Sequence, residues 1–249
     1  MEIVNKHLNP AQAPLLASSP TGYLLLAAEL DRRPMFLPGS RAKTRLIQEV
    51  KGLAADLERH DAVERATVFH GFAHLVFGIN HRLMRRAEAQ GVERARYDLV
   101  VLVETADAAQ ARTLRDDTTY QRLVHRVEAT ARRTFETATA NTRCMGDVER
   151  ERRGVFLFNF FYAQDNEELI PVWEYTAGWW NVKTDLDNSH VLEPLDDERK
   201  DYGIINHCRW DRLRDVAPQM VFRPSFRRFV LANFTANGIS AQPTLYRLA

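Results

Sequence analysis

Apolar residues along the chain follow two periods, one typical of strands and one typical of helices. Short apolar runs of strand composition begin at Gly22, Tyr97, Gly154 and Tyr202. The first run precedes a stretch in which Leu46, Val50, Leu53 and Leu57 recur at helical spacing. This spacing predicts a helix at about 41–60.

A second helix is predicted after the run at 154, over about 167–183. The residues expected on its buried face are Leu169, Val172, Trp173, Thr176 and Trp180. Asp165 and Asn166 precede the pattern and are suited to cap its first turn. Large apolar side chains on one face indicate packing against a sheet.

The two halves of the chain resemble one another in their landmarks. Tyr97 and Tyr202 open similar strands at an offset of 105, and Tyr120 and Phe226 lie in similar charged, helix-like stretches at an offset of 106. Each half therefore reads strand, helix, strand, strand, helix, strand, with final strands near 141–148 and 244–248. This order is that of a ferredoxin-like split βαβ unit. We predict an α+β fold of two tandem βαββαβ repeats packed sheet to sheet, divided into 1–150 and 151–249.

The first half is longer, and the extra residues are expected between 69 and 93. There Val68, Phe72, Val76, Ile79 and Leu83 suit a helix. The alternative is that 69–77 continues a strand. If the helix forms, His70, His74 and His81 lie on one face of it and are candidate ligands for a metal or for haem iron.

Composition narrows the class of protein. The chain of 249 residues is 45% hydrophobic and 27% charged, enough to build a core without metal or disulfide staples. A net charge of +1 gives no reason to expect nucleic acid or a membrane surface as a partner. Two cysteines and no apolar stretch of membrane-spanning length favour a reducing, cytoplasmic setting. Arginine clusters, such as the one at 150–153, are expected on solvated surfaces.

The paired strand-then-helix runs at 97–123 and 202–229, with the block 172–179 and the following Asp187-Asn-Ser, resemble the dimeric α/β-barrel superfamily. The similarity is to tandem-repeat members related to antibiotic-biosynthesis monooxygenases. It implies an intramolecular barrel, a pocket between sheet and helices, and a small-molecule substrate. The implied function is a cofactor-independent oxygenase or cyclase of secondary metabolism acting on an aromatic or polyketide-like substrate. A haem protein and a non-catalytic binding module remain alternatives, and the internal pseudo-dimer leaves a further homodimer open.

Polar side chains in the apolar strands are the candidate catalytic residues. Asn159 and Asn206 lie on neighbouring strands and are predicted to line one cavity beside Trp210. Each amide either fixes strand register by a hydrogen bond or orients a substrate oxygen. His207, a possible general base, and Arg209, a possible anchor for an anionic oxygen, lie on the opposite face of the same strand. The sequence leaves open which face meets the helices.

Aromatic side chains are the candidate substrate-binding residues. Tyr162, Trp173 and Trp210 would supply flat walls for a planar substrate. The alternative interpretation is that the tryptophans belong to the core. The sequence contains neither a phosphate-binding glycine loop nor a Gly-x-Ser-x-Gly elbow.

Overall fold

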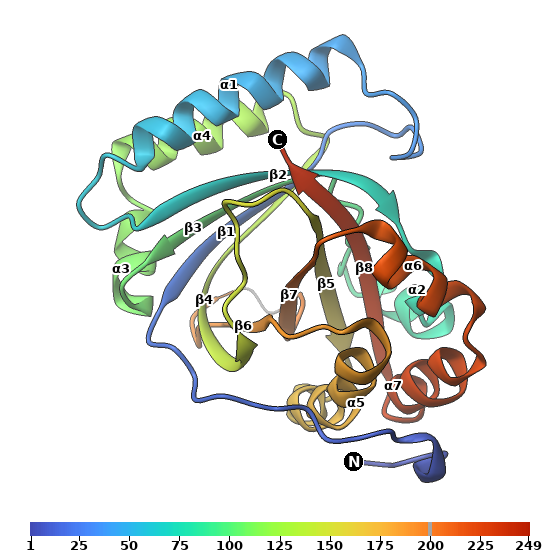
Figure 1. Ribbon diagram of the computed structural model, residues 1–249. Helices are drawn as coiled ribbons and strands as arrows, with labels where there is room; N and C mark the ends of the chain where they lie inside the picture. Colours follow the sequence, from blue (N-terminus) through green and yellow to red (C-terminus); the bar gives the residue numbers. More distant parts are fainter. Residues whose placement is uncertain (199–200) are drawn as a thin grey trace.

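A closed antiparallel barrel of eight strands organises the computed structural model, which describes residues 1–198 and 201–249 (Figure 1). The strands are β1 (Gly22–Glu29), β2 (Arg65–His74), β3 (Leu99–Thr105), β4 (Arg133–Gly146), β5 (Val155–Ala163), β6 (Ser189–Pro194), β7 (Ile204–Trp210) and β8 (Ile239–Leu248). Their order around the ring is β1-β3-β2-β8-β5-β7-β6-β4. Opened at the β2–β8 and β6–β4 seams, the ring gives β4-β1-β3-β2 and β8-β5-β7-β6. Both sheets have the ferredoxin-like order, so the predicted fold class is confirmed.

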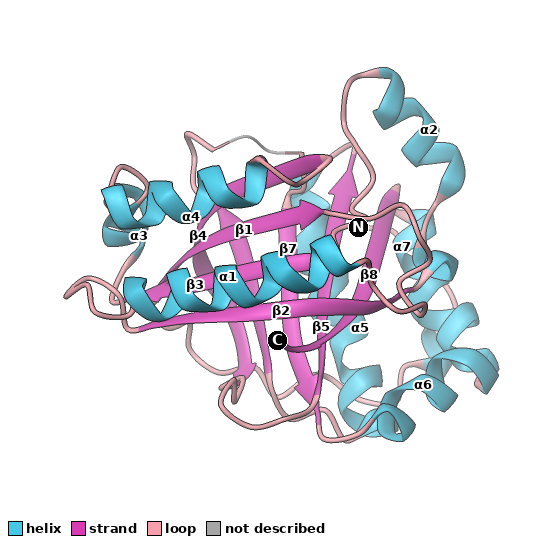
Figure 2. Cartoon of the chain, turned by 90° about the horizontal axis from the view of Figure 1, so that it is seen from above, coloured by secondary structure: helices cyan, strands magenta, loops and turns pink. Residues whose placement is uncertain are grey.

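Helices cover the outside of this ring in two groups (Figures 1 and 2). The α-helices are α1 (Arg41–Leu57), α2 (His81–Ala89), α3 (Ala108–Leu114), α4 (Thr118–Glu128), α5 (Leu169–Thr184), α6 (Leu213–Phe222) and α7 (Ala232–Ala236), with a π-helical segment at Phe226–Leu231. Helices α1 and α4 lie over the first-half sheet, whereas α5 and α7 lie over the second-half sheet. None of the helices in the described ranges has the length and apolar character needed to cross a bilayer.

The predicted helix starts have local causes. Ser40 accepts a hydrogen bond from the Lys43 backbone N–H and begins α1. Asp165 accepts one from the Glu167 N–H and begins the short 3₁₀ turn that leads into α5, as predicted. The predicted helices at 41–60 and 167–183 are thus present with small differences at their ends.

Alternation along the strands separates two cores. On β5, Phe156, Phe158 and Phe160 point into the barrel, while Val155, Leu157 and Phe161 pack against the helices. The barrel interior is filled by aromatic rings from both halves, including Phe69, Phe135, Tyr97, Tyr202 and Tyr246. Aromatic side chains therefore occupy the volume between the two sheets.

The helix expected between 69 and 93 is present only as α2, and the expected helix over 69–80 is wrong. Strand β2 continues to His74, with a register shift between Gly71 and Ala73, and a 3₁₀ turn at Val76–Gly78 precedes α2. Backbone pairing with β3 and β8 outweighs the helical spacing of Val68, Phe72 and Val76. The alternative of a continuing strand describes this segment better. The final strands also begin earlier than expected, at Arg133 and Ile239.

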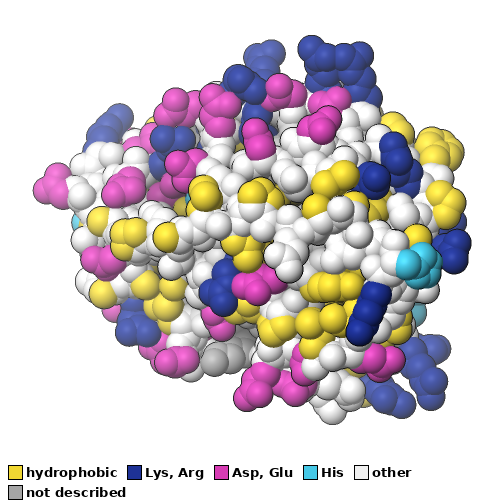
Figure 3. All heavy atoms as spheres, turned by 60° about the horizontal axis from the view of Figure 1, so that its bottom comes forward, with side chains coloured by type: hydrophobic (Ala, Val, Ile, Leu, Met, Phe, Trp, Pro, Cys, Tyr) yellow, Lys and Arg dark blue, Asp and Glu magenta, His cyan; other side chains and the backbone are white. Residues whose placement is uncertain are grey.

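The N-terminal segment crosses the outer face of α5. Val4 and Glu2 pair with Asn233 and Asn237 near α7, and a Cβ added at Gly178 would lie 2.0 Å from the Ala11 carbonyl oxygen. Glycine at this helix position allows the segment to pass at contact distance. The face that includes these helices carries apolar side chains in several small groups separated by charged ones (Figure 3).

Candidate functional site

A small cavity lies between the second-half sheet and the helices α5 and α7. Asn159 and Asn206 line it from the sheet, and Trp173, Trp180 and Trp210 form aromatic walls. Its volume of about 20 Å³ is room for about one water molecule. Among the described lining residues there is no carboxylate, imidazole, ammonium or guanidinium group, and burial raises the pKa of the Cys208 thiol well above its ordinary value. The cavity is therefore largely apolar, and the polar side chains that line it are uncharged.

The two asparagines are cross-strand partners, yet their hydrogen bonding differs. Asn206 Nδ2 donates to Ser189 Oγ and to the His190 carbonyl oxygen, which ties β7 to β6. Asn159 Oδ1 is buried and has no hydrogen-bond partner. The structural interpretation, a bond that fixes register, thus applies to Asn206. Asn159 carries an unmet hydrogen bond, which costs about 1–3 kcal/mol.

The first half places apolar residues where the second half has these amides. Aligning β3 with β7 through Tyr97 and Tyr202 matches Val101 to Asn206. Val101 pairs with Leu26 as Asn206 pairs with Asn159. Leu26 and Val101 are fully buried in the core under α1 and α4. The fold therefore does not require polar groups at this ladder position, and the second half alone carries them.

The aromatic walls are held in different ways. Trp210 Nε1 donates to Thr184 Oγ1 at 3.0 Å, while Trp173 is buried in the core beneath α5. Trp180 is half-buried and contacts the Trp210 ring at a centroid distance of 6.1 Å. Tyr162, expected at the same site, instead packs beside Ile79 and Met84 near α2, so it does not line the cavity.

His207 and Arg209 point away from this cavity, into the barrel. His207 is fully buried, stacks on Phe158 with ring centroids 4.1 Å apart, and donates from Nδ1 to the Leu157 carbonyl oxygen. Burial, with the Arg150 cation, holds its pKa well below the usual 6.5. Arg209 Nη2 donates to the Arg153 carbonyl, and Nη1 lies 2.9 Å from Asp211 Oδ1. In this structure neither residue can contact a molecule in the cavity.

His70, His74 and His81 do not converge. His70 and His74 lie on β2, and His81 is the first residue of α2. His74 Nδ1 is paired with Thr244 Oγ1 at 2.9 Å, and its pKa is lowered to about 4, first by burial and then by Arg96 and Arg94. Within 1–198 and 201–249, the three imidazoles form no common ligand cluster. The single helix that would carry all three histidines is absent, because β2 includes His70 and His74.

Haem requires an axial ligand and a space for the macrocycle. The described lining of the cavity offers the sulfur atoms of Met145 and Cys208 but no imidazole. Burial raises the pKa of the Cys208 thiol well above its ordinary value, so this residue does not supply a thiolate ligand. These residues do not fit a haem group.

Sequence reasoning missed a polar cluster at one end of the barrel interior. Arg150, expected on the solvated surface, is only 6% exposed. Its guanidinium contacts Glu104 Oε1 at 2.6 Å, His190 Nδ1 at 3.1 Å, His207 Nε2 at 3.3 Å and the Tyr23 hydroxyl at 3.4 Å. Side chains from four strands therefore contact one cation. Only closure of the barrel brings these four strands around it. The available signal was a histidine, His190, directly before the apolar pair Val191 and Leu192.

Comparison with known proteins bears on the fold. No protein-family model matches the chain, and no curated protein matches it in sequence. An anthrone oxidase-like protein is similar in structure, with TM-score 0.67 and 10% identity over 95% of this chain and 94% of that one. A candidate monooxygenase of Fusobacterium nucleatum gives TM-score 0.56 and 5% identity over 92% and 93% of the two chains. A candidate chlorite dismutase gives TM-score 0.50 and 9% identity over 93% and 95%. Strand order and these likenesses together show that the chain has the dimeric α/β-barrel fold, with two ferredoxin-like halves of one chain closing the barrel.

Proposed function

We propose that this protein is a small-molecule enzyme, a cofactor-independent oxygenase or cyclase that takes a flat aromatic or polyketide-like substrate into the second-half cavity. The observation that carries the proposal is the unpartnered amide oxygen of Asn159 among aromatic walls. A buried polar atom that costs stability and serves no structural bond is accounted for by a ligand that supplies its partner.

Asn159 accepts a hydrogen bond from a substrate hydroxyl, or donates one through Nδ2 to an enolate oxygen. The lining residues offer no strong base at neutral pH, so the substrate itself must be acidic, as phenols and anthrones are. In the oxygenase reaction, a ring CH2 and O2 give a ring C=O and H2O. The substrate carbon first loses one proton to solvent, and the resulting carbanion supplies the electrons. One oxygen atom enters the product, and the other leaves with the second carbon-bound hydrogen as hydroxide, which takes back the released proton to form water.

Entry of a planar substrate requires the cavity to enlarge. Trp180 is the half-buried wall, whereas Trp173 and Trp210 are buried. Outward rotation of Trp180 would open the cavity while Asn159 stays fixed on β5. Return of the Trp180 indole would then exclude water from the substrate anion. Exclusion of water strengthens the hydrogen bond that the Asn159 amide donates to this anion.

The similarity to an anthrone oxidase-like protein supports the choice of probe, although the likeness concerns the fold. The experiment measures oxygen uptake and quinone absorbance with an anthrone as the probe. We expect turnover above the spontaneous rate, and a fall of about 100- to 1000-fold in Asn159→Ala on loss of one oriented hydrogen bond.

The matched variant is Asn206→Ala, whose amide holds β6 through Ser189. It is expected to lower stability more than turnover. Full turnover in Asn159→Ala would contradict the proposed role. Anthrone binding without oxygen uptake would instead indicate a non-catalytic binding module.

A further inference from the structure

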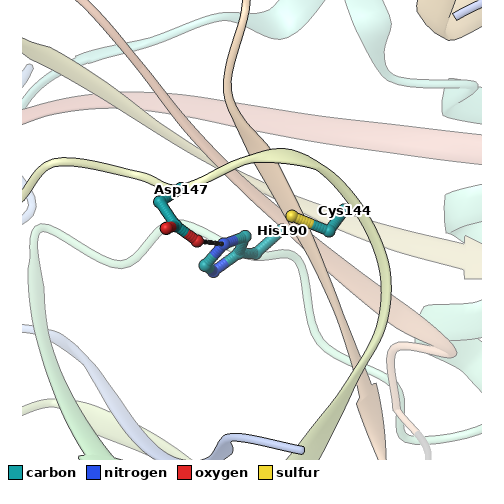
Figure 4. A group of neighbouring side chains, drawn as sticks. All are labelled: Cys144, Asp147 and His190. Carbon is teal, nitrogen blue, oxygen red and sulfur yellow. Dashed lines mark ion pairs between the residues drawn. The ribbon is translucent and has the colours of Figure 1, made fainter. Parts of the chain in front are cut away.

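Three side chains with metal-ligating atoms lie together at the seam between β4 and β6, outside the cavity. Cys144 Sγ, one carboxylate oxygen of Asp147 and one ring nitrogen of His190 all lie within 4.8 Å of one another (Figure 4). Cys144 and His190 are buried, whereas Asp147 is exposed. The group therefore reaches from the barrel interior to solvent.

The local backbone brings these side chains to one side. Cys144 and His190 are direct partners in the β4–β6 ladder. Strand β4 ends at Gly146, where φ is +151° and an added Cβ would lie 2.3 Å from the Asp187 carbonyl oxygen. Only glycine fits this turn, and it carries Asp147 back toward the imidazole. The Asp147 carboxylate then lies 3.7 Å from His190 Nε2.

His190 has an unmet hydrogen bond that faces this group. The residue is 4% exposed, and its buried Nε2 has no hydrogen-bond partner. Its Nδ1 lies 3.0 Å from the Tyr23 hydroxyl. Imidazoles that bind metals commonly place the second nitrogen against such a partner, which orients the ring and fixes its tautomer.

We propose that Cys144, Asp147 and His190 bind one divalent transition-metal ion of the zinc class. A thiolate, an imidazole and a carboxylate are the ligand types that zinc takes, and three protein ligands leave one position for water. Two anionic ligands neutralise the charge of the ion, and the neighbouring Arg150 is neutralised by Glu104 at 2.6 Å.

The donor atoms need a small movement to bind. Around a tetrahedral zinc ion, with bonds of about 2.0–2.3 Å, ligand atoms lie about 3.5 Å apart. Because the Asp147 side chain is exposed, its carboxylate can move from 3.7 Å to this shorter distance from His190 Nε2. A neighbouring cleft of about 530 Å³, lined by six carboxylates and two arginines, attracts cations toward Asp147.

Binding at Nε2 also shifts a hydrogen bond. Without metal, Arg150 Nη2 donates to His190 Nδ1 at 3.1 Å, so the ring proton is on Nε2. With metal on Nε2, the proton moves to Nδ1 and is donated to the Tyr23 oxygen. Tyr23 is therefore a positioning residue for the metal.

The experiment is a titration of the chelator-treated protein with Co²⁺, followed by displacement with Zn²⁺. We expect one Co²⁺ per chain and a thiolate-to-cobalt absorption band that disappears in Cys144→Ala. In Tyr23→Phe the affinity should fall by about 10- to 100-fold, as for other outer partners of metal-bound histidines. Cys208→Ala, which removes the other cysteine, should leave the band unchanged.

Circular dichroism verifies that each variant is folded. If Cys144→Ala does not fold, the conservative Tyr23→Phe variant decides the question. Absence of a thiolate band in the wild-type protein would overturn the proposal, as would its persistence in Cys144→Ala or unaltered affinity in Tyr23→Phe. Binding of Co²⁺ without the thiolate-to-cobalt band would indicate that the ion binds only in the acidic cleft.

Discussion

The hydroxyl groups of Tyr97 and Tyr202 lie 3.0 Å apart inside the barrel, although the two residues are 105 positions apart in sequence. Tyr202 donates its only proton to the Glu93 carbonyl oxygen at 2.9 Å, so Tyr97 must donate to Tyr202. Each tyrosine precedes the third strand of its half. The two residues that align the halves in the sequence thus also join those halves in space.

This chain of hydrogen bonds predicts unequal effects of removing each hydroxyl. Tyr202→Phe leaves both the Tyr97 hydroxyl and the Glu93 carbonyl without partners, and we expect a loss of about 2 kcal/mol in the free energy of unfolding. Tyr97→Phe removes one donor and should cost about 1 kcal/mol. Urea denaturation of the single and double variants measures both values. Strict additivity would show that the hydroxyls do not interact.

Asn159→Leu introduces the residue found at the equivalent position of the first half, Leu26. Because Asn159 Oδ1 has no partner, we expect the free energy of unfolding to rise by about 1 kcal/mol while anthrone turnover falls. The comparison variant is Asn206→Val, which introduces the residue type of its first-half equivalent, Val101, and should be destabilised because Ser189 loses its donor. A destabilised Asn159→Leu would mean that the amide has a structural role.

Arg150→Met tests the buried cation. Removal leaves the Glu104 carboxylate and two imidazoles without their shared donor, so we expect a loss of about 3–5 kcal/mol. Arg153→Met, at an exposed position in the same loop, should change stability by less than about 0.5 kcal/mol. Equal effects in chemical denaturation would contradict the role assigned to Arg150.

Gly178→Ala should have the opposite sign to an ordinary helix substitution. Alanine normally stabilises a helix interior relative to glycine by about 1 kcal/mol. At Gly178 its Cβ would collide with the Ala11 carbonyl, so we expect lower stability and faster proteolysis of the N-terminal segment. The control is Gly52→Ala in α1, where no atom lies within 4 Å of the added Cβ and stability should rise.

The lowered pKa of His74 leads us to expect a loss of stability in acid. Its folded-state pKa is about 4, below the ordinary 6.5, so the unfolded chain binds more protons between these values. Stability should therefore fall as the pH drops from about 6.5 toward 4. Denaturation midpoints measured across this window should vary less in His74→Gln. An unchanged pH dependence in that variant would show that His74 does not contribute.

Strand and helix order followed from local pattern, since apolar alternation and caps at Ser40 and Asp165 act within a few residues. The prediction failed at 69–80 because the apolar residues there are spaced as in a helix. In the structure β2, which includes the start of this segment, instead pairs with β3 and β8. The pairing of Asn159 with Asn206 was predictable from strand adjacency. The placement of His207 was not, because alternation defines two faces without saying which one meets the helices.

The sequence by itself determined the repeated strand-and-helix order, the cross-strand amides and the aromatic helix α5. Tertiary structure alone decided that the barrel interior is filled and that Arg150 and His190 meet at one end of that interior. The physical reason is that periodicity is a property of neighbouring residues. The phase of each strand and the contacts between distant loops are set only when the ring closes and its side chains compete for the same volume.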